Sequence, residues 1–139
     1  MVELAVVLVI VAILMSIGLA SYFAMANTAD GKGTQLDLVT ATKVQALHHL
    51  EQDAFTDDAG VLVALEPTLQ YSAAGDPAGS IVVEIEPGRE TLDVCLFART
   101  PQGDWFSVRH STTDGDRYAQ SAPVACTPDE TDGWSTESW

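Results

Sequence analysis

Basic residues are scarce in this chain of 139 residues, because six Lys and Arg stand against 20 Asp and Glu and the formal net charge is −14. A protein of that charge repels phosphate backbones, so we expect no direct contact with nucleic acid. Cysteine is scarce as well. The two cysteines, Cys95 and Cys126, form no CxxC pair, which excludes a zinc ribbon and a thioredoxin-type motif.

Charge is missing altogether from one long stretch near the N-terminus. From Leu4 to Ala29 there are 26 uncharged residues, LAVVLVIVAILMSIGLASYFAMANTA. As a helix this stretch would be roughly 39 Å long, which is enough to cross the hydrocarbon core of a bilayer. A secretory signal peptide is a poor fit, because no Lys or Arg precedes the stretch and because it is too long. The basic flank of an ordinary membrane anchor is missing too.

Glu3 lies directly before this apolar stretch. A carboxylate beside so many apolar residues is costly to ionise in lipid or protein unless it meets a positive partner. Two interpretations stay open. Either Glu3 lies in the layer of lipid headgroups, or its partner is an amine from another copy of the chain, because the first residues contain no Lys or Arg.

The residues MVELAVVLVIVAILMSIGLASYF resemble the N-terminal segment of a mature type IV pilin or pseudopilin. Members of that family are made with a short basic leader, which a prepilin peptidase removes, and the new N-terminus is then methylated. A glutamate follows within an apolar helix, and Glu3 matches it, with Leu4 and the aliphatic run behind. The resemblance covers the first quarter of the chain.

The chain departs from the family pattern at two places. Glu3 lies two residues after Met1, closer to the N-terminus than the family's glutamate usually lies, so either two residues are missing from the chain as given or the N-terminal register differs. Many pilins also have a proline at the position that Ala20 occupies here. We therefore expect the long helix to kink or unwind at another position.

Glycines mark the expected breaks in this helix. Gly18 lies inside the apolar stretch, and Gly31 and Gly33 lie in the cluster NTADGKG. Thr34 to Asp37 then resembles a capping box that starts a helix again. We expect helices at about 1–27 and 34–55, either collinear or joined by an unwound stretch. The apolar face of the second helix is expected to consist of Leu36, Val39, Lys43 or Val44, Leu47, Leu50 and Ala54.

The rest of the chain predicts a small antiparallel sheet. Residues 56–79 form a long connection, in which 61–65 is a short helix or strand. Strands are expected at 81–86, 92–99 and 105–110, where apolar residues alternate with others. Packed on the second half of the helix, they make an α+β fold that is pilin-like. We divide the chain into an apolar transmembrane or filament-core helix, 1–30, and a globular head, 31–139.

The two cysteines are candidates for a disulfide, which is common in domains outside the cytoplasm. Cys95 is expected on the strand face opposite Val94 and Leu96, so a bridge to Cys126 would hold the C-terminal segment over the outer face or edge of the sheet. Closing a loop of about 32 residues stabilises a fold by roughly 3–4 kcal/mol in the chain-entropy model. The alternative is two buried, unpaired thiols. Pilins often link a C-terminal loop to the sheet in this way, so the resemblance agrees with the bridge.

No residue pattern predicts catalysis. His48 and Glu51 have a spacing that could hold a metal, together with His49, but further ligands are not evident and a solvated helix face is favoured. His110 has no accompanying nucleophile motif. Two acidic groups resemble calcium loops without the spacing of an EF-hand, so acidic turns are favoured there: Asp53, Asp57 and Asp58, and Asp114 with Asp116. We expect no enzyme, no cofactor and no metal.

The C-terminal residues 127–139 combine acidic side chains with Trp134 and Trp139. They form either a frayed acidic terminus or a segment whose two tryptophans pack against the sheet or against a neighbouring copy.

The resemblance implies a structural subunit that polymerises through its N-terminal helix into an extracellular type IV pilus-like filament. Its expected partners are other copies of itself, the cytoplasmic membrane before assembly, the prepilin peptidase and the pilus assembly machinery. A minor pilin or a pseudopilin of a secretion or DNA-uptake machine is the first alternative. A single-span anchored binding domain that stays monomeric is an alternative of another class, and a membrane-tethered enzyme is a distant third.

Overall fold

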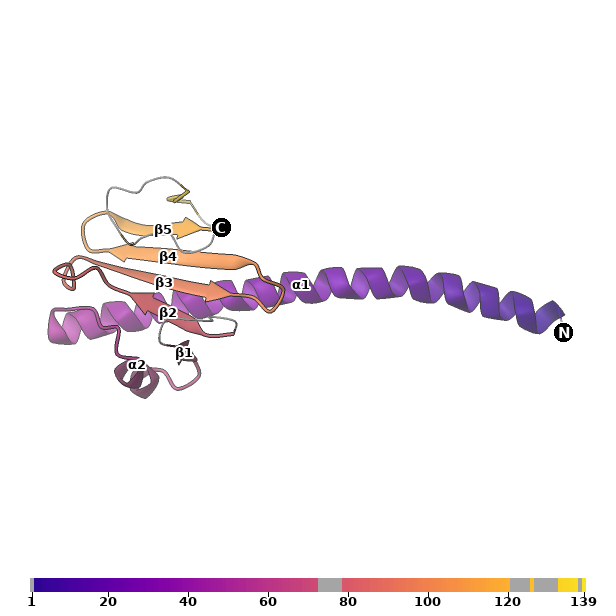
Figure 1. The fold of residues 1–139 in the computed structure, drawn as a ribbon, viewed down its shortest axis with the longest axis horizontal. Helices are drawn as coiled ribbons and strands as arrows, with labels where there is room; N and C mark the ends of the chain where they lie inside the picture. Colours follow the sequence, from indigo (N-terminus) through magenta and orange to yellow (C-terminus); the bar gives the residue numbers. More distant parts are fainter. Residues whose placement is uncertain (1, 73–78, 121–125, 127–132, 138) are drawn as a thin grey trace.

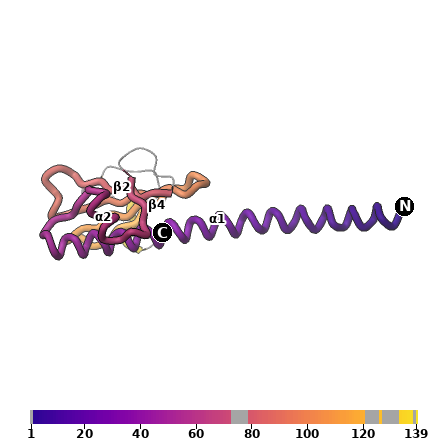
Figure 2. Tube along the Cα trace, turned by 90° about the horizontal axis from the view of Figure 1, so that it is seen from below, coloured from indigo at the N-terminus to yellow at the C-terminus, as the bar shows by residue number. Residues whose placement is uncertain are grey.

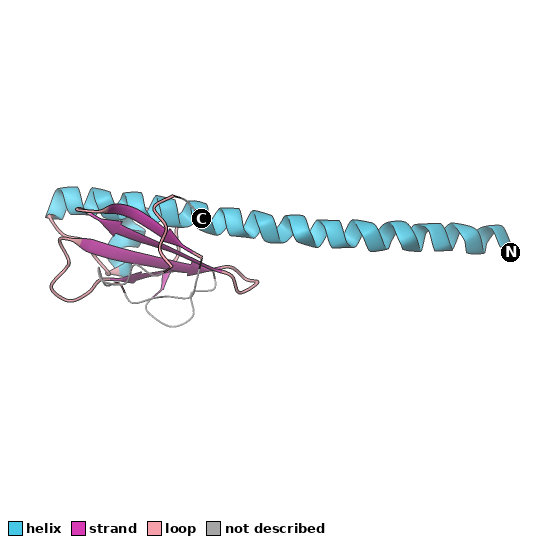
Figure 3. Ribbon diagram, turned by 90° about the horizontal axis from the view of Figure 1, so that it is seen from above, coloured by secondary structure: helices cyan, strands magenta, loops and turns pink. Residues whose placement is uncertain are grey.

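One helix, α1 (Val2–Gln52), extends far beyond the rest of the protein (Figures 1 and 2). The computed structural model describes residues 2–72, 79–120, 126, 133–137 and 139. The C-terminal half of α1 lies along one face of a β-sheet, whereas its N-terminal half projects away from the head (Figure 3). The fold is α+β, as predicted.

The helix is continuous through Gly18, Gly31 and Gly33, so the predicted breaks at these three glycines are wrong. The hydroxyl of Thr34 donates to the carbonyl oxygen of Asp30 at 3.0 Å, within the preceding turn, instead of capping a new helix. A Cβ at Gly31 would lie 3.7 Å from the ring of Phe106, an ordinary contact distance. The head therefore packs directly beside this glycine. Each helical glycine costs about 1 kcal/mol, which a helix of 51 residues tolerates because helix propagation is cooperative.

The sheet has five strands in the order β1-β2-β3-β4-β5. These strands are β1 (Tyr71–Ser72), β2 (Ile81–Glu84), β3 (Asp93–Arg99), β4 (Trp105–Ser111) and β5 (Gly115–Ala119). The pair β1 and β2 is parallel and the other pairs are antiparallel. Three strands were predicted, and β1 and β5 were not, since β1 has two residues and β5 reads GDRYA without alternating apolar residues. The undecided segment at 61–65 belongs to a helix, α2 (Ala59–Leu65).

The main core lies between α1 and the sheet. Leu38 and Ala41 of the helix pack against the strand residues that were predicted to face it, which are Leu96, Ala98, Phe106 and Val108. The predicted apolar face of the helix is largely wrong. Leu36, Leu47 and Leu50 are 66%, 49% and 83% exposed, and the buried helix residues are Leu38, Ala41, Thr42, Val44 and Gln45.

Polar partners explain why this other face of α1 is buried. The side chain of Gln45 donates to the carbonyl oxygen of Thr56 at 2.6 Å and accepts from the backbone N–H of Thr56 at 3.2 Å. The hydroxyl of Thr42 donates to the carbonyl oxygen of Leu38 at 2.9 Å. Because these groups are satisfied, they can lie in the interior. The small side chain of Ala41 also lets the helix approach the sheet closely.

The outer face of the sheet carries a second core. The disulfide between Cys95 and Cys126 is formed, and Cys95 lies opposite the helix-facing side, as predicted. Val82, Phe97 and Trp134 pack around it. Trp139 lies near the opposite face, where its ring meets Phe106 and Tyr118 edge to face. Both C-terminal tryptophans therefore pack against the sheet.

We predict that Gly33→Ala stabilises α1 by about 0.5–1 kcal/mol, because alanine is the better helix former and nothing lies within 4 Å of the new Cβ. Slower amide hydrogen exchange at residues 29–37 would show it. Gly88→Ala is the contrasting variant, because Gly88 has a φ of +86° and alanine is strained there. Equal effects of the two substitutions would contradict the continuous helix.

We predict that Cys95→Ala with Cys126→Ala lowers the free energy of unfolding by about 3–4 kcal/mol, because the bridge closes a loop of 31 residues in sequence separation. Urea unfolding of the full chain in a non-ionic detergent, followed by tryptophan fluorescence, measures this change. The reduced wild-type chain is the control and should unfold like the double variant.

Candidate assembly surface

The N-terminal half of α1 presents apolar side chains to its surroundings on every side. From Val2 to Met25 its large hydrophobic residues are between 40% and 78% exposed. By length and composition this helix could cross a membrane, and none of its most apolar stretch is buried inside the protein. Such a surface is stable only in lipid or against other apolar surfaces.

Glu3 lies in the first turn of α1 and is exposed. A carboxylate is favoured there by the helix dipole, whose N-terminal end is positive. Among the described residues, no ion pair involves Glu3. Within the described part of the chain, Glu3 is therefore a carboxylate without an ion-pair partner at the tip of an apolar helix that stands free of the head.

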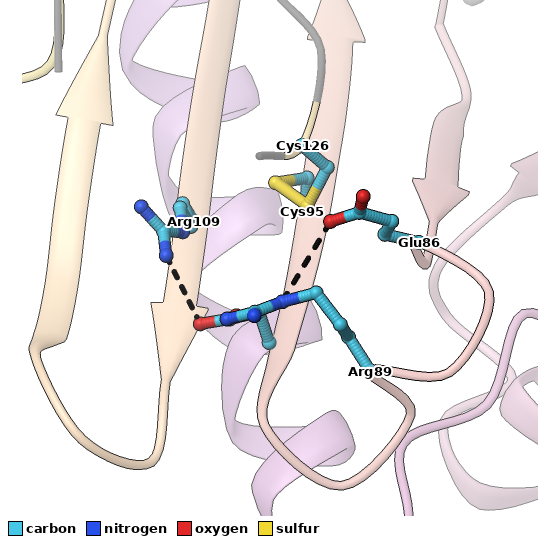
Figure 4. Close-up of a disulfide and its surroundings, with 6 residues drawn as sticks. Glu86, Arg89, Cys95, Arg109 and Cys126 are labelled. Carbon is cyan, nitrogen blue, oxygen red and sulfur yellow. Dashed lines mark hydrogen bonds and ion pairs between the residues drawn. A yellow bond between two sulfur atoms is a disulfide. The ribbon is translucent and has the colours of Figure 1, made fainter. Parts of the chain in front are cut away.

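A buried ion cluster lies on the outer face of the sheet beside the disulfide (Figure 4). Asp93 is fully buried, and its carboxylate accepts from Arg89 and, at 3.2 Å, from Arg109. Arg109 is 2% exposed. Arg89 also lies 3.7 Å from Glu86, across the β2–β3 connection. The cluster thus joins strands β3 and β4 to the loop that precedes β3. Sequence analysis missed it, because Arg89, Asp93 and Arg109 form no recognisable motif.

The charge state of Asp93 follows from these partners. Burial by itself raises the pKa of Asp93, but hydrogen bonds from Ser111 and Arg89 and the positive charge of Arg109 outweigh that effect. The pKa of Asp93 is therefore lowered from its usual value. Asp93 stays ionised in the folded protein. Its ion pairs stabilise the folded state at pH values above the unfolded-state pKa of this carboxyl.

The histidines have structural partners. Nδ1 of His48 lies 2.8 Å from the carbonyl oxygen of Ala54, and Nε2 of His49 lies 3.1 Å from that of Thr91. His110 lies 2.5 Å from the carboxylate of Asp116. Phe55 packs between the rings of His49 and His110. The described part of the chain holds no group of three or more residues that could ligate a metal.

The acidic turns likewise have local roles. Asp58 caps α2 by accepting from the backbone N–H groups of Gly60 and Val61, at 2.8 and 3.4 Å. Asp53, at the end of α1, adopts a positive φ of 58°. Asp114 follows β4 in the turn to β5. These residues shape connections at one end of the head.

One further surface was not foreseen. The side of α1 that faces away from the sheet carries the exposed residues Lys32, Leu36, Lys43, Leu47 and Leu50, which we call the lysine face. Periodicity had assigned the three leucines to the core. The presence of both lysines of the chain on the same helical face as these leucines is the sequence signal that could have marked this face as an exposed surface.

No family model, curated protein or solved structure matches this chain. The architecture, a long apolar N-terminal helix on a small mixed sheet with a disulfide, is compatible with a pilin-like fold.

We predict that Asp93→Asn lowers the free energy of unfolding by about 3–5 kcal/mol near neutral pH, because it leaves two arginines without their buried counter-charge. Because folding lowers the pKa of Asp93, the stability that its ion pairs contribute is fully present above the unfolded-state pKa, about 3.9. That stability is lost as the pH falls through the lower folded-state pKa. Urea unfolding between pH 7 and pH 2 should therefore show an acid loss of stability in the wild type that is smaller in the variant.

The matched control for this experiment is Asp104→Asn, which removes an exposed carboxylate from the turn between β3 and β4. It should change the unfolding free energy by less than about 0.5 kcal/mol, as is usual for surface positions. If Asp93→Asn behaved like this control, the ion cluster would not stabilise the fold.

Proposed function

We propose that this protein is a structural subunit that polymerises through its N-terminal helix into an extracellular type IV pilus-like filament. The observation that carries the proposal is the division of α1 into two halves. One half is held by the sheet, and the other exposes apolar side chains along its whole length. The unassembled subunit would keep that half in the cytoplasmic membrane and transfer it to a bundle of like helices during assembly. Lipid and neighbouring helices are similarly apolar, so the transfer is near neutral in hydrophobic terms.

In this proposal Glu3 sets the register between subunits. An isolated carboxylate inside an apolar bundle is costly unless a positive group lies beside it, so docking in the wrong register is disfavoured. The partner we propose is the N-terminal amine of a neighbouring copy. The disulfide and the two tryptophans hold the head together outside the membrane, where its negative charge faces solvent.

The resemblance of the N-terminal residues supports the same family and its partners, which are the prepilin peptidase and the pilus assembly machinery. A major subunit of the filament is favoured, and a minor pilin or a pseudopilin of a secretion or DNA-uptake machine comes second. Because the net charge is −14, we assign any contact with DNA to another subunit.

A monomeric anchored domain is the candidate of another class, because a single apolar helix is also stable in lipid alone. In that case Glu3 would affect only topology. The two proposals therefore differ in what happens when Glu3 is removed.

We predict that Glu3→Ala leaves membrane insertion intact but reduces the yield of filaments at least tenfold, because the variant loses the charge that sets the register. Electron microscopy of sheared material measures filament yield, and membrane fractionation measures insertion. Mass spectrometry of the N-terminus tests processing and methylation.

Glu84→Ala is the matched control, because Glu84 is an exposed carboxylate on the head. It should assemble like the wild type. Normal filament yield from Glu3→Ala would overturn the role of Glu3, and a wild-type chain that stays monomeric in the membrane would favour the anchored domain.

A further inference from the structure

The lysine face carries positive charge, which is unusual in this strongly acidic protein. Both lysines of the chain lie on it, at Lys32 and Lys43, although 20 acidic residues are available elsewhere to pair with them. Neither lysine forms an ion pair with a described residue, and Lys32 donates to the side chain of Gln35 at 3.2 Å. The four arginines differ: Arg89 and Arg109 are paired with Asp93, Arg99 lies over the Trp105 ring, and Arg117 is half-buried. The lysines are thus the exposed, unpaired cations of the described chain.

Apolar side chains accompany these two cations. Leu36, Leu47 and Leu50 lie on the same side of the helix, at helical spacing, and Leu50 is 83% exposed. In Figure 3 the sheet lies on the other side of α1, and no described segment covers this face. A helix face that combines leucines and unpaired lysines is suited to a partner that is acidic and partly apolar.

The chain itself has an acidic surface at the end of the head that lies farthest from the N-terminus (Figure 1). Three connections meet there, because Phe55 donates to the carbonyl oxygen of Glu90 at 2.7 Å and Thr112 donates to that of Leu92 at 2.9 Å. We call the exposed carboxylates of this end the acidic rim, which consists of Glu51, Asp53, Asp57, Glu90 and Asp114. The one Lys or Arg in these connections, Arg89, is paired with Asp93.

We propose that the acidic rim of a second copy of this chain docks on the lysine face, with the two α1 helices parallel and staggered along their axes. The proposal rests on the proposed function, because the shared apolar N-terminal halves make the helices parallel. A copy displaced by eight residues, about 12 Å, toward the N-terminus brings its Glu51 level with Lys43 of the first copy. That displacement leaves Glu3 of one copy about 9 Å or more along the axis from the N-terminus of the other, so the copy that docks here is a different neighbour from the one whose amine pairs with Glu3. A displacement of about 29 Å brings Glu51 level with Lys32.

Charge selects the staggered arrangement over the unstaggered one. Without a stagger, Lys43 faces Lys43 and the two acidic rims lie side by side, so both contacts are repulsive. With a stagger, each contact joins opposite charges, and Leu47 and Leu50 cover the contact from water. The arrangement is heterologous, since the lysine face of one copy and the acidic rim of the other stay free. Further copies can therefore add at both ends, as a filament requires.

The first test uses the fact that both lysines of the chain lie on the lysine face, so a cross-link to a lysine reports on that face. Unlabelled and ¹⁵N-labelled full-length chains are assembled together and treated with a water-soluble carbodiimide, which joins a lysine amine to a nearby carboxylate as an amide. Mass spectrometry of mixed-isotope peptides then identifies contacts between copies. We expect Lys43 or Lys32 joined to a carboxylate of the acidic rim. Assemblies whose mixed peptides join the lysines to other carboxylates, or to none, overturn this docking contact and leave the filament proposal standing.

Sedimentation before cross-linking separates the two proposals. A wild-type chain that does not assemble at all overturns the proposed function and the docking contact together. An assembled chain allows the contact to be judged from its cross-linked peptides alone.

The second test compares two variants of equal charge. Lys43→Gln and Thr136→Glu each change the formal net charge from −14 to −15, and both positions are exposed, but Thr136 lies in the C-terminal segment outside the acidic rim. We expect Lys43→Gln to raise the concentration needed for assembly about tenfold, as loss of a close charge pair does. Thr136→Glu should leave it near the wild-type value. Equal effects of the two variants would mean that net charge alone matters and would overturn the contact.

A reversed pair completes this test. The rim carboxylate that the cross-link identifies is changed to Lys in the Lys43→Glu background. Recovery of assembly in the double variant, but in neither single variant, supports direct pairing, whereas no recovery overturns it. Non-reducing electrophoresis confirms in each case that the Cys95–Cys126 disulfide has formed.

Discussion

The packing of Leu38 and Ala41 against strands β3 and β4 is the contact on which the rest of the structure depends. It holds the C-terminal half of α1 to the sheet, and it determines which side of that half stays exposed. The N-terminal half has no such contact, so it extends freely from the head. A continuous helix transmits the orientation of the head to the apolar half, because no turn or unwound segment separates them.

The proposed assembly uses both halves of this helix for different purposes. The apolar half can exchange lipid for other helices at little cost, but an apolar surface by itself specifies no register. Charges supply the register, with Glu3 at one end and the lysine face farther along. In a chain so strongly acidic, two exposed lysines on one side of a helix are well suited to select how another acidic copy approaches.

Some features of the fold could be predicted from the sequence because they depend on local patterns. Alternating apolar residues located β3 and β4 and their helix-facing sides, and two cysteines in a chain of this kind allowed one pairing. Predictions from local patterns failed at positions where tertiary contacts determine the structure. Thr34 resembles a cap but bonds within the preceding turn, and β5 forms by pairing with β4 although its residues have no strand pattern. Asp93 and its arginines come together only through the sheet register, so no spacing in the sequence predicted their pairing.

The sequence by itself determined the apolar N-terminal helix, the position of Glu3 at its start, the acidic head and the two sheet faces around Cys95. These follow from composition and periodicity, which act over a few residues. Only the tertiary structure decided which side of α1 is buried. Gln45 and Thr42 could enter the interior because Thr56 and Leu38 offer them hydrogen bonds, and the leucines at 36, 47 and 50 were left outside. Burial depends on shape and on satisfied polar groups as well as on hydrophobicity, and those partners come from distant parts of the chain as well as from the helix itself.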